Sequence, residues 1–180
     1  MDVPYFCRMK KNICLLFLMV VFLCACKKPV NYSDIPEIKF ISFHKYQDTQ
    51  IQDGAILTFS FKDGDGDIGL HEWETYPPFD STSIYYYNFF CDYYEKQKGV
   101  FVKIDFNLNA RIPRLSKLQK ESIHGEIYLT LPFYYDITSP YTDTIQLKFN
   151  IVDRKLNKSN TETIIIDRTR FTIQSLKIQS

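Results

Sequence analysis

The chain has only three histidines, and their positions favour neither catalysis nor zinc binding. His44, His71 and His124 lie far apart in the sequence and lack the short spacings of zinc ligands. The segment from His71 to Glu74 is not the His-Glu-x-x-His motif of metalloproteases. The sequence also lacks the Gly-x-Ser-x-Gly motif of serine hydrolases, a phosphate-binding P-loop and a dinucleotide-binding fingerprint. We therefore expect a protein that is not an enzyme.

The sequence also lacks an apolar run that is clearly long enough to span a bilayer. The run 13–23 covers eleven residues, whereas a membrane-spanning helix needs about 20. Three basic residues, Arg8, Lys10 and Lys11, precede it. A basic segment followed by a short apolar core is typical of a secretory signal peptide. Met9 is a natural alternative start of the chain.

The end of this apolar run, Leu23-Cys24-Ala25-Cys26, resembles a bacterial lipobox. The resemblance implies cleavage before Cys26 and covalent lipid on that residue. Several acyl chains, at about 0.8 kcal/mol for each buried CH₂, hold a protein firmly on a membrane. We expect a lipoprotein signal peptide at 1–25 and a lipidated tether at 26–35. The alternative is an ordinary secreted protein with an incidental cysteine.

The residue after the lipidated cysteine bears on the location of the protein. It is Lys27 and not aspartate, which favours the outer membrane by resemblance to the sorting rule of enteric bacteria. Some bacteria of the Bacteroidota type mark surface-exposed lipoproteins with an acidic run at this point, and here the run is Lys27-Lys28-Pro29. The sequence therefore favours the periplasmic face of the outer membrane over the cell surface.

After the predicted cleavage point, the chain has few cysteines and almost no net charge. Only Cys91 remains beside Cys26, so no internal disulfide can form once Cys26 carries lipid. We expect Cys91 to pack as a small buried hydrophobe. Removing residues 1–25 takes away three basic residues and one acidic residue, and leaves 19 basic against 20 acidic residues. This balance argues against nucleic-acid binding and leaves membrane attachment to the lipid anchor.

From residue 36 onward the helical pattern is almost absent, and alternation of apolar and polar residues prevails. The predicted strands are 38–43, 55–61, 84–91, 100–106, 127–131, 144–152 and 161–173. A phase slip between Phe40 and Ile41 indicates a β-bulge. We expect 84–91 to be a central strand, 95–99 to be a hairpin turn and 115–121 to hold at most one helical turn. Seven to eight short strands predict an all-β fold for 36–180, namely an antiparallel immunoglobulin-like β-sandwich behind the cleaved lipoprotein signal peptide.

Glycine is rare, with six residues in the chain, and four of them lie between Gly54 and Gly69. Three of these glycines lie in the segment Asp63-Gly64-Asp65-Gly66-Asp67-Ile68-Gly69, where Gly64 and Gly66 separate the three carboxylates. Ca²⁺ prefers six to eight oxygen ligands, and closely spaced carboxylates in a loop supply several of them. The loop is not an EF-hand, because Ile68 stands at the position that requires glycine and a strand precedes the loop.

We expect this loop to lie at one end of the sandwich and to form a structural Ca²⁺ site with Asp63, Asp65 and Asp67 as ligands. Asp153, in the polar turn 153–160, completes the site if both loops share one end of the sandwich. The alternative is a solvated turn, because aspartate and glycine both suit tight turns. Mutual repulsion of three nearby carboxylates argues against that alternative, since a cation would relieve it.

Two segments carry a resemblance to known proteins. Phe61 to Gly69 is similar to a recurring signature in small lipoproteins of Bacteroidota. Ile151 to Asn160 resembles the final hairpin of bacterial immunoglobulin-like domains, which often read Asp-Arg-Ala-Gly-Asn-x-Ser; this chain has Lys155 and Leu156 where alanine and glycine are usual. The resemblance implies a fold and an envelope location, and no particular activity.

The sequence is compatible with two functions. The leading hypothesis is a non-enzymatic, lipid-anchored module of the cell envelope that binds a protein partner or stabilises an envelope complex. The alternative is a carbohydrate-binding accessory lipoprotein of a glycan-uptake system, in which Trp73 and Tyr76 stack on sugar rings. The aromatic segment carries the alternative, because exposed aromatic rings stack on sugars and peptides, and tyrosine and tryptophan are favoured at interfaces.

Overall fold

The computed structural model describes residues 31–46, 54–116, 121–132 and 143–167. The predicted signal peptide, the lipidation site Cys26 and the first part of the tether lie outside these ranges, as do most of the predicted helical turn at 115–121 and the end of the last predicted strand. Asn31–Ser180 form one compact unit. Within the described ranges, the structure holds no helix with the length and apolar character that a membrane crossing requires.

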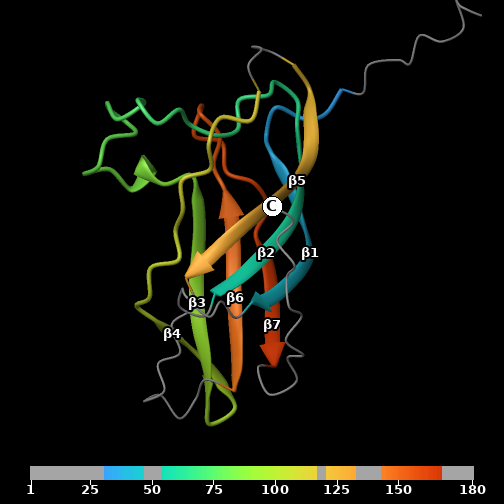
Figure 1. Cartoon of the computed structure of the whole chain (residues 1–180), viewed down its shortest axis with the longest axis vertical. Coiled ribbons are helices and arrows are strands. Elements are labelled where there is room, and N and C mark those ends of the chain that lie inside the picture. Colours follow the sequence, from blue (N-terminus) through green and yellow to red (C-terminus); the bar gives the residue numbers. More distant parts are fainter. Residues whose placement is uncertain (1–30, 47–53, 117–120, 133–142, 168–180) are drawn as a thin grey trace, which may run out of the picture. The chain divides into compact units, whose positions relative to one another are not determined.

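The described residues form an antiparallel β-sandwich of seven strands (Figure 1). In chain order, the elements are β1 (Glu37–Tyr46), β2 (Gly54–Asp63), the 3₁₀ helix η1 (Ile84–Tyr86), β3 (Phe89–Gln97), β4 (Val100–Ile104), β5 (Ile123–Pro132), β6 (Thr144–Ile151) and β7 (Glu162–Asp167). One sheet has the order β1-β2-β5 and the other the order β4-β3-β6-β7, with antiparallel pairing throughout. The predicted fold class and strand number are confirmed, and the division of the strands is consistent with an immunoglobulin-like sandwich.

Alternating apolar residues of the two sheets meet in one core. The Phe59 ring of β2 lies 5.8 Å from the Phe89 ring of β3 and 5.6 Å from the Phe149 ring of β6, measured between centroids. Burying each such side chain contributes about 1.5–3 kcal/mol. Cys91 lies in the same core as a free thiol, as predicted, and burial raises its pKa to about 12. The inward face predicted for 144–152 is fully buried at Ile145, Leu147, Phe149 and Ile151.

The phase slip in the first strand is a real irregularity of pairing. The register of β1 against β2 shifts between Phe40 and Ser42, so the predicted bulge is confirmed. Before the slip, the free edge of β1 forms hydrogen bonds with the side chains of Asn160, which precedes β7, and Glu162, the first residue of that strand. The Asn160 amide donates to the Ile38 carbonyl at 2.9 Å and accepts from the Ile38 N–H at 2.8 Å. The two sheets are thereby joined along one side by side-chain hydrogen bonds.

The prediction for 84–91 is wrong in its first half. Ile84–Tyr86 is a 3₁₀ helix, because the Ser83 hydroxyl caps it by accepting the Tyr85 N–H at 3.1 Å. The side chain of Asn88 then accepts from the Ile112 N–H at 2.6 Å and donates to the Ile112 carbonyl at 2.9 Å. These local bonds compete with strand pairing, so β3 begins only at Phe89. β3 is central in its sheet, between β4 and β6, as predicted.

The hairpin after β3 is tighter than the predicted turn at 95–99. Gln97 pairs directly with Val100, and the two residues between them, Lys98 and Gly99, have φ angles of 50° and 88°. Two consecutive residues with positive φ match the right-handed twist of the flanking strands. Residues 95–97 therefore belong to the strand and not to the turn.

The segment predicted as a tether contacts the domain before β1 begins. The Tyr32 ring packs edge-on against the His124 ring of β5, with centroids 5.7 Å apart. The Ser33 carbonyl accepts the Gly64 N–H at 2.7 Å. The chain therefore enters the sandwich beside the aspartate-rich loop.

Candidate metal centre

The aspartate-rich loop and the turn after β6 lie at the same end of the sandwich (Figure 1). Asp63 is the last residue of β2, in the three-stranded sheet, and Asp153 follows the end of β6, in the four-stranded sheet. The side-chain oxygens of Asp63, Asp67 and Asp153 all lie within 4.8 Å of one another. The structure thus brings together two segments that are about 90 residues apart, as the shared-end prediction requires.

We call these three carboxylates the aspartate triad, and hydrogen bonds within each segment orient two of them. Asp63 Oδ2 accepts the Asp67 N–H at 2.9 Å. Asp153 accepts the Asn157 N–H at 2.8 Å and the Asn157 side-chain amide at 2.9 Å. Asp63 and Asp153 are buried, and Asp67 is half-buried. The carboxylates of Asp63 and Asp153 are therefore each held by hydrogen bonds from their own loop.

In the aspartate-rich loop, three carboxylate oxygens are buried with no hydrogen-bond partner among the described residues: Oδ1 of Asp63, of Asp65 and of Asp67. The Asp63 side chain has no exposed surface, and Asp65 is 8% exposed. An unsatisfied buried acceptor costs about 1–3 kcal/mol, and more when it is charged. A cation placed among these oxygens would satisfy them together.

The electrostatics of the aspartate triad agree with its geometry. Burial raises the pKa of Asp63 from 3.8 to about 6, and the charges of Asp65 and Asp153 add to the rise. Burial raises the pKa of Asp67 to about 7, with further contributions from Asp153, Asp65 and Asp63. The pKa of Asp153 is also raised, mainly by burial. Loss of water and mutual repulsion both disfavour three unpaired carboxylates, and a bound cation would offset both.

Asp65 lies beside the aspartate triad but has a different partner. Its Oδ2 forms an ion pair with the ammonium group of Lys155, which is exposed at the tip of the turn after β6. The sequence predicted Asp65 as a metal ligand, and the structure leaves only its buried Oδ1 directed to that role. Lys155 supplies a positive charge at the rim of the site in the absence of metal.

The glycines of the loop permit close approach of a neighbouring segment. Gly66 and Gly69 have φ angles of +68° and +89°, a region that side chains disfavour. A Cβ atom at Gly66 would collide with the Glu121 carbonyl oxygen, and one at Gly69 with the Pro113 carbonyl oxygen. The loop is therefore enclosed by the segment between β4 and β5, which explains why its aspartates are buried.

The sequence did not identify three charged residues beside the triad, namely Glu74, Arg154 and Arg114. Glu74 has no exposed surface; its Oε2 accepts the His71 N–H at 2.7 Å, and its Oε1 forms an ion pair with the Arg154 guanidinium. Arg114 also lies close enough to interact with Asp67, Glu74 and Asp63. Glu74 lies in an irregular polar insert and Arg154 in a polar turn, so no periodic pattern marked either side chain as buried or paired.

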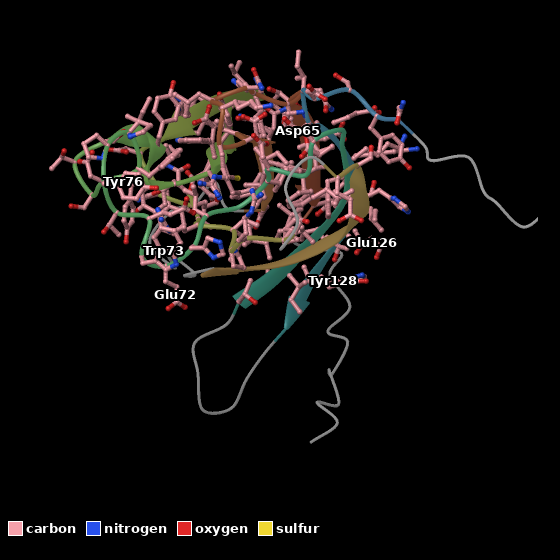
Figure 2. The ribbon with its side chains drawn as sticks, turned by 90° about the horizontal axis from the view of Figure 1, so that it is seen from above. Asp65, Glu72, Trp73, Tyr76, Glu126 and Tyr128 are labelled. Atoms are coloured by element: carbon pink, nitrogen blue, oxygen red, sulfur yellow. The ribbon has the colours of Figure 1, made fainter. Side chains whose placement is uncertain are left out.

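Trp73 and Tyr76, the predicted ligand-binding residues, lie on the insert between β2 and β3. Figure 2 places both away from Asp65. Trp73 is 66% exposed and stacks on the His71 ring at 5.0 Å, with 10° between the ring planes, and Tyr76 is 49% exposed. They form an exposed aromatic surface that is separate from the aspartate triad.

Comparison of the chain with protein-family models, with curated proteins and with solved structures found no match.

The raised pKa values predict how the metal-free protein responds to pH. Between about pH 3.8 and 7, the folded state retains protons on Asp63 and Asp67 that the unfolded chain has released. The stabilisation from these protons is fully present below about pH 3.8 and is lost as the pH rises through 6 to 7. We expect the metal-free 27–180 fragment to be less stable at about pH 8 than at about pH 5, in urea unfolding after dialysis against a chelator.

The control for this pH dependence is the double variant Asp63→Asn/Asp67→Asn, which removes both titrating groups. Its free energy of unfolding should change less with pH across the same range. Equal pH profiles for the variant and the wild type would show that other groups dominate.

Proposed function

We propose that the chain is a non-enzymatic, lipid-anchored protein of the bacterial cell envelope, on the periplasmic face of the outer membrane, whose β-sandwich serves as a binding module braced at one end by Ca²⁺. The signal-peptide pattern and the lipobox-like segment ending at Cys26 support the location. The aspartate triad with its buried, unpartnered oxygens carries the proposal for the metal.

The donor atoms favour Ca²⁺ over transition metals. All the candidate ligands in the triad are carboxylate oxygens, which suit hard cations, and neither histidine nor cysteine belongs to the group. Ca²⁺ binds oxygen at about 2.3–2.6 Å, so ligands on opposite sides of one ion lie up to about 5 Å apart. The triad oxygens, within 4.8 Å of one another, fit that limit.

The position of the site indicates a structural role for the ion. Asp63 and Asp67 come from the end of β2, whereas Asp153 comes from the turn after β6, so one ion would link the two sheets. The same two segments lead into the insert that carries Trp73 and Tyr76 and into the turn that carries Arg154. We infer that the ion fixes the loops at this end of the sandwich so that they present a defined surface to a partner.

Calorimetric titration of the 27–180 fragment with Ca²⁺ tests this proposal. We expect one binding event per chain in the wild type and its loss in Asp67→Asn, which removes a charged ligand while keeping the size of the side chain. Asp105→Asn is the matched control, because Asp105 is exposed beyond the end of β4. No heat of binding in the wild type, or equal binding by Asp67→Asn, would contradict the proposal.

The alternative function is a carbohydrate-binding accessory lipoprotein of a glycan-uptake system. The exposure of Trp73 favours it, because an aromatic ring that is 66% exposed is free to stack on a sugar. A glycan array probed with the 27–180 fragment separates the two functions: clear hits that are lost in Trp73→Ala would favour the carbohydrate-binding alternative.

A further inference from the structure

A cleft of about 320 Å³ lies on the outer face of the four-stranded sheet. Phe89 and Cys91 of β3 and Phe149 and Ile151 of β6 face the core, so the residues that alternate with them face outward. These outward residues form the floor of the cleft. Tyr85 of η1 forms part of one wall, and Leu156 and Lys158 of the turn after β6 form part of the other. Figure 1 shows η1 at the end of the sandwich where β3 begins and β6 ends.

The side-chain amide of Asn150 lies in the floor of this cleft and has no hydrogen-bond partner among the described residues. The residue is only 9% exposed and lines the cleft. Its amide makes no hydrogen bond to any described residue, and its polar atoms are not sealed off from the cleft. A buried amide is usually hydrogen-bonded, so an unpaired one that opens into a cavity indicates a ligand or solvent partner.

The charges around the cleft favour an anion. Two lysines line it, Lys148 and Lys158, and neither has a carboxylate partner among the described residues. Lys148 lies with its ammonium group 4.8 Å from the centroid of the Tyr94 ring. Among the described residues that line the cleft, the one carboxylate is Asp92, and it forms an ion pair with Lys103 at 2.7 Å.

The apolar side chains of the cleft favour a ligand in which an apolar group is attached to the anion. Tyr85, Phe90 and Leu156 supply aromatic and aliphatic surface, with Ile84 and Val152 beside them. The few hydrogen-bonding groups suit one carboxylate better than the several hydroxyls of a sugar acid. The volume lies at the lower end of the range for small-ligand sites, about 300–1,000 Å³.

We propose that this cleft binds the carboxyl terminus of a peptide whose last residue is apolar. The carboxylate lies between the Asn150 amide and the lysine ammonium groups, and the last side chain lies against Tyr85 and Phe90. The proposal deepens the proposed binding role, because it names the chemistry of the partner, and it does not depend on the metal. Failure here would leave the calorimetric result for Ca²⁺ untouched.

The test measures chemical shifts of the ¹⁵N-labelled 27–180 fragment during titration with N-acetylphenylalanine. Its neutral analogue N-acetylphenylalaninamide has the same ring and lacks the carboxylate. We expect saturable shifts at residues of the cleft, including the Asn150 side-chain amide, with the acid, and at least tenfold weaker binding of the amide. Equal binding of both compounds, or no shifts at the cleft with the acid, would overturn the proposal.

Two substitutions on β6 sharpen this test. Asn150→Asp puts a negative charge opposite the carboxylate, and we expect affinity to fall at least tenfold without loss of the fold, since the Asn150 amide makes no hydrogen bond to any residue that the structure describes. Gln146→Glu adds the same charge on the same outward face of β6 outside the cleft and should retain affinity to within about threefold. An equal loss in both variants would contradict recognition of the carboxylate by Asn150.

Two further titrations separate this site from the alternatives. Glucuronate tests an acidic sugar, and Trp73→Ala tests the exposed aromatic surface. We expect glucuronate to bind at least tenfold more weakly than N-acetylphenylalanine, and Trp73→Ala to bind the latter like the wild type. Tighter binding of glucuronate, or loss of binding in Trp73→Ala, would reject the peptide terminus as the ligand of this cleft.

Discussion

Excess Ca²⁺ should raise the melting temperature of the 27–180 fragment by about 5–10 °C. A ligand at 100 times its dissociation constant stabilises the folded state by about 2.7 kcal/mol. In a domain of this size, each kcal/mol raises the melting temperature by about 2–4 °C. The effect is expected because a bound ion offsets the loss of water and the mutual repulsion of the carboxylates, which together raise the pKa of Asp63 and Asp67. Thermal unfolding followed by circular dichroism, with chelator or with excess Ca²⁺, measures the shift.

Asp63→Asn should change stability in opposite directions in the two conditions. In chelator, the variant is expected to be more stable than the wild type at neutral pH by about 1–3 kcal/mol, because it removes a buried charge whose pKa is raised to about 6. An asparagine at this position also keeps an oxygen that accepts the Asp67 N–H. In excess Ca²⁺, the variant should lose most of the stabilisation that the wild type gains.

The sign of this reversal distinguishes a metal site from a structural carboxylate. If Asp63 served only to cap the loop through the Asp67 N–H, the substitution would be neutral or destabilising in both conditions, and Ca²⁺ would stabilise the variant and the wild type equally. Asp105→Asn, which alters an exposed carboxylate, should behave like the wild type in both conditions.

The fold was predictable where a strand has one buried face. The alternation from Ala55 to Phe61 and from Ile145 to Ile151 predicted β2 and β6, because a strand that is buried on one face must alternate. Where local side-chain hydrogen bonds compete with strand pairing, the pattern of apolar residues gave a wrong prediction. The aromatic run at 84–88 has high strand propensity, but the Ser83 cap and the Asn88 side chain hold it outside the sheet.

The sequence predicted those residues of the candidate metal site that lie where strands end. Asp63 and Asp153 follow strands that end at one end of the sandwich, and the sequence already placed both at turns. The cleft and the pairing of Glu74 with Arg154 depend on how the insert folds back onto the turn after β6. Their residues show no periodicity, and the contacts between them span about 80 residues, so only the three-dimensional structure reveals them.

Arg154→Met should destabilise the domain by about 3 kcal/mol. Glu74 has no exposed surface, and its carboxylate forms an ion pair with the Arg154 guanidinium, so removal of the arginine leaves a buried charge without its partner. Removing one member of a buried pair costs about 3–5 kcal/mol, and we take the lower end because 31% of the Arg154 side chain is exposed. Urea unfolding of the 27–180 fragment in excess Ca²⁺ measures the loss.

Lys155→Met is the matched control, because it removes the neighbouring cation, which is 58% exposed and pairs with Asp65. An exposed pair contributes about 0–1 kcal/mol, so this variant should lose much less stability than Arg154→Met. The double variant Glu74→Gln/Arg154→Met should recover part of the loss, because it removes the stranded charge together with its partner. Equal losses in the two single variants would mean that Arg154 acts as an ordinary surface charge. A loss confined to Arg154→Met, with recovery in the double variant, would show that the Glu74–Arg154 pair holds the insert against the turn after β6.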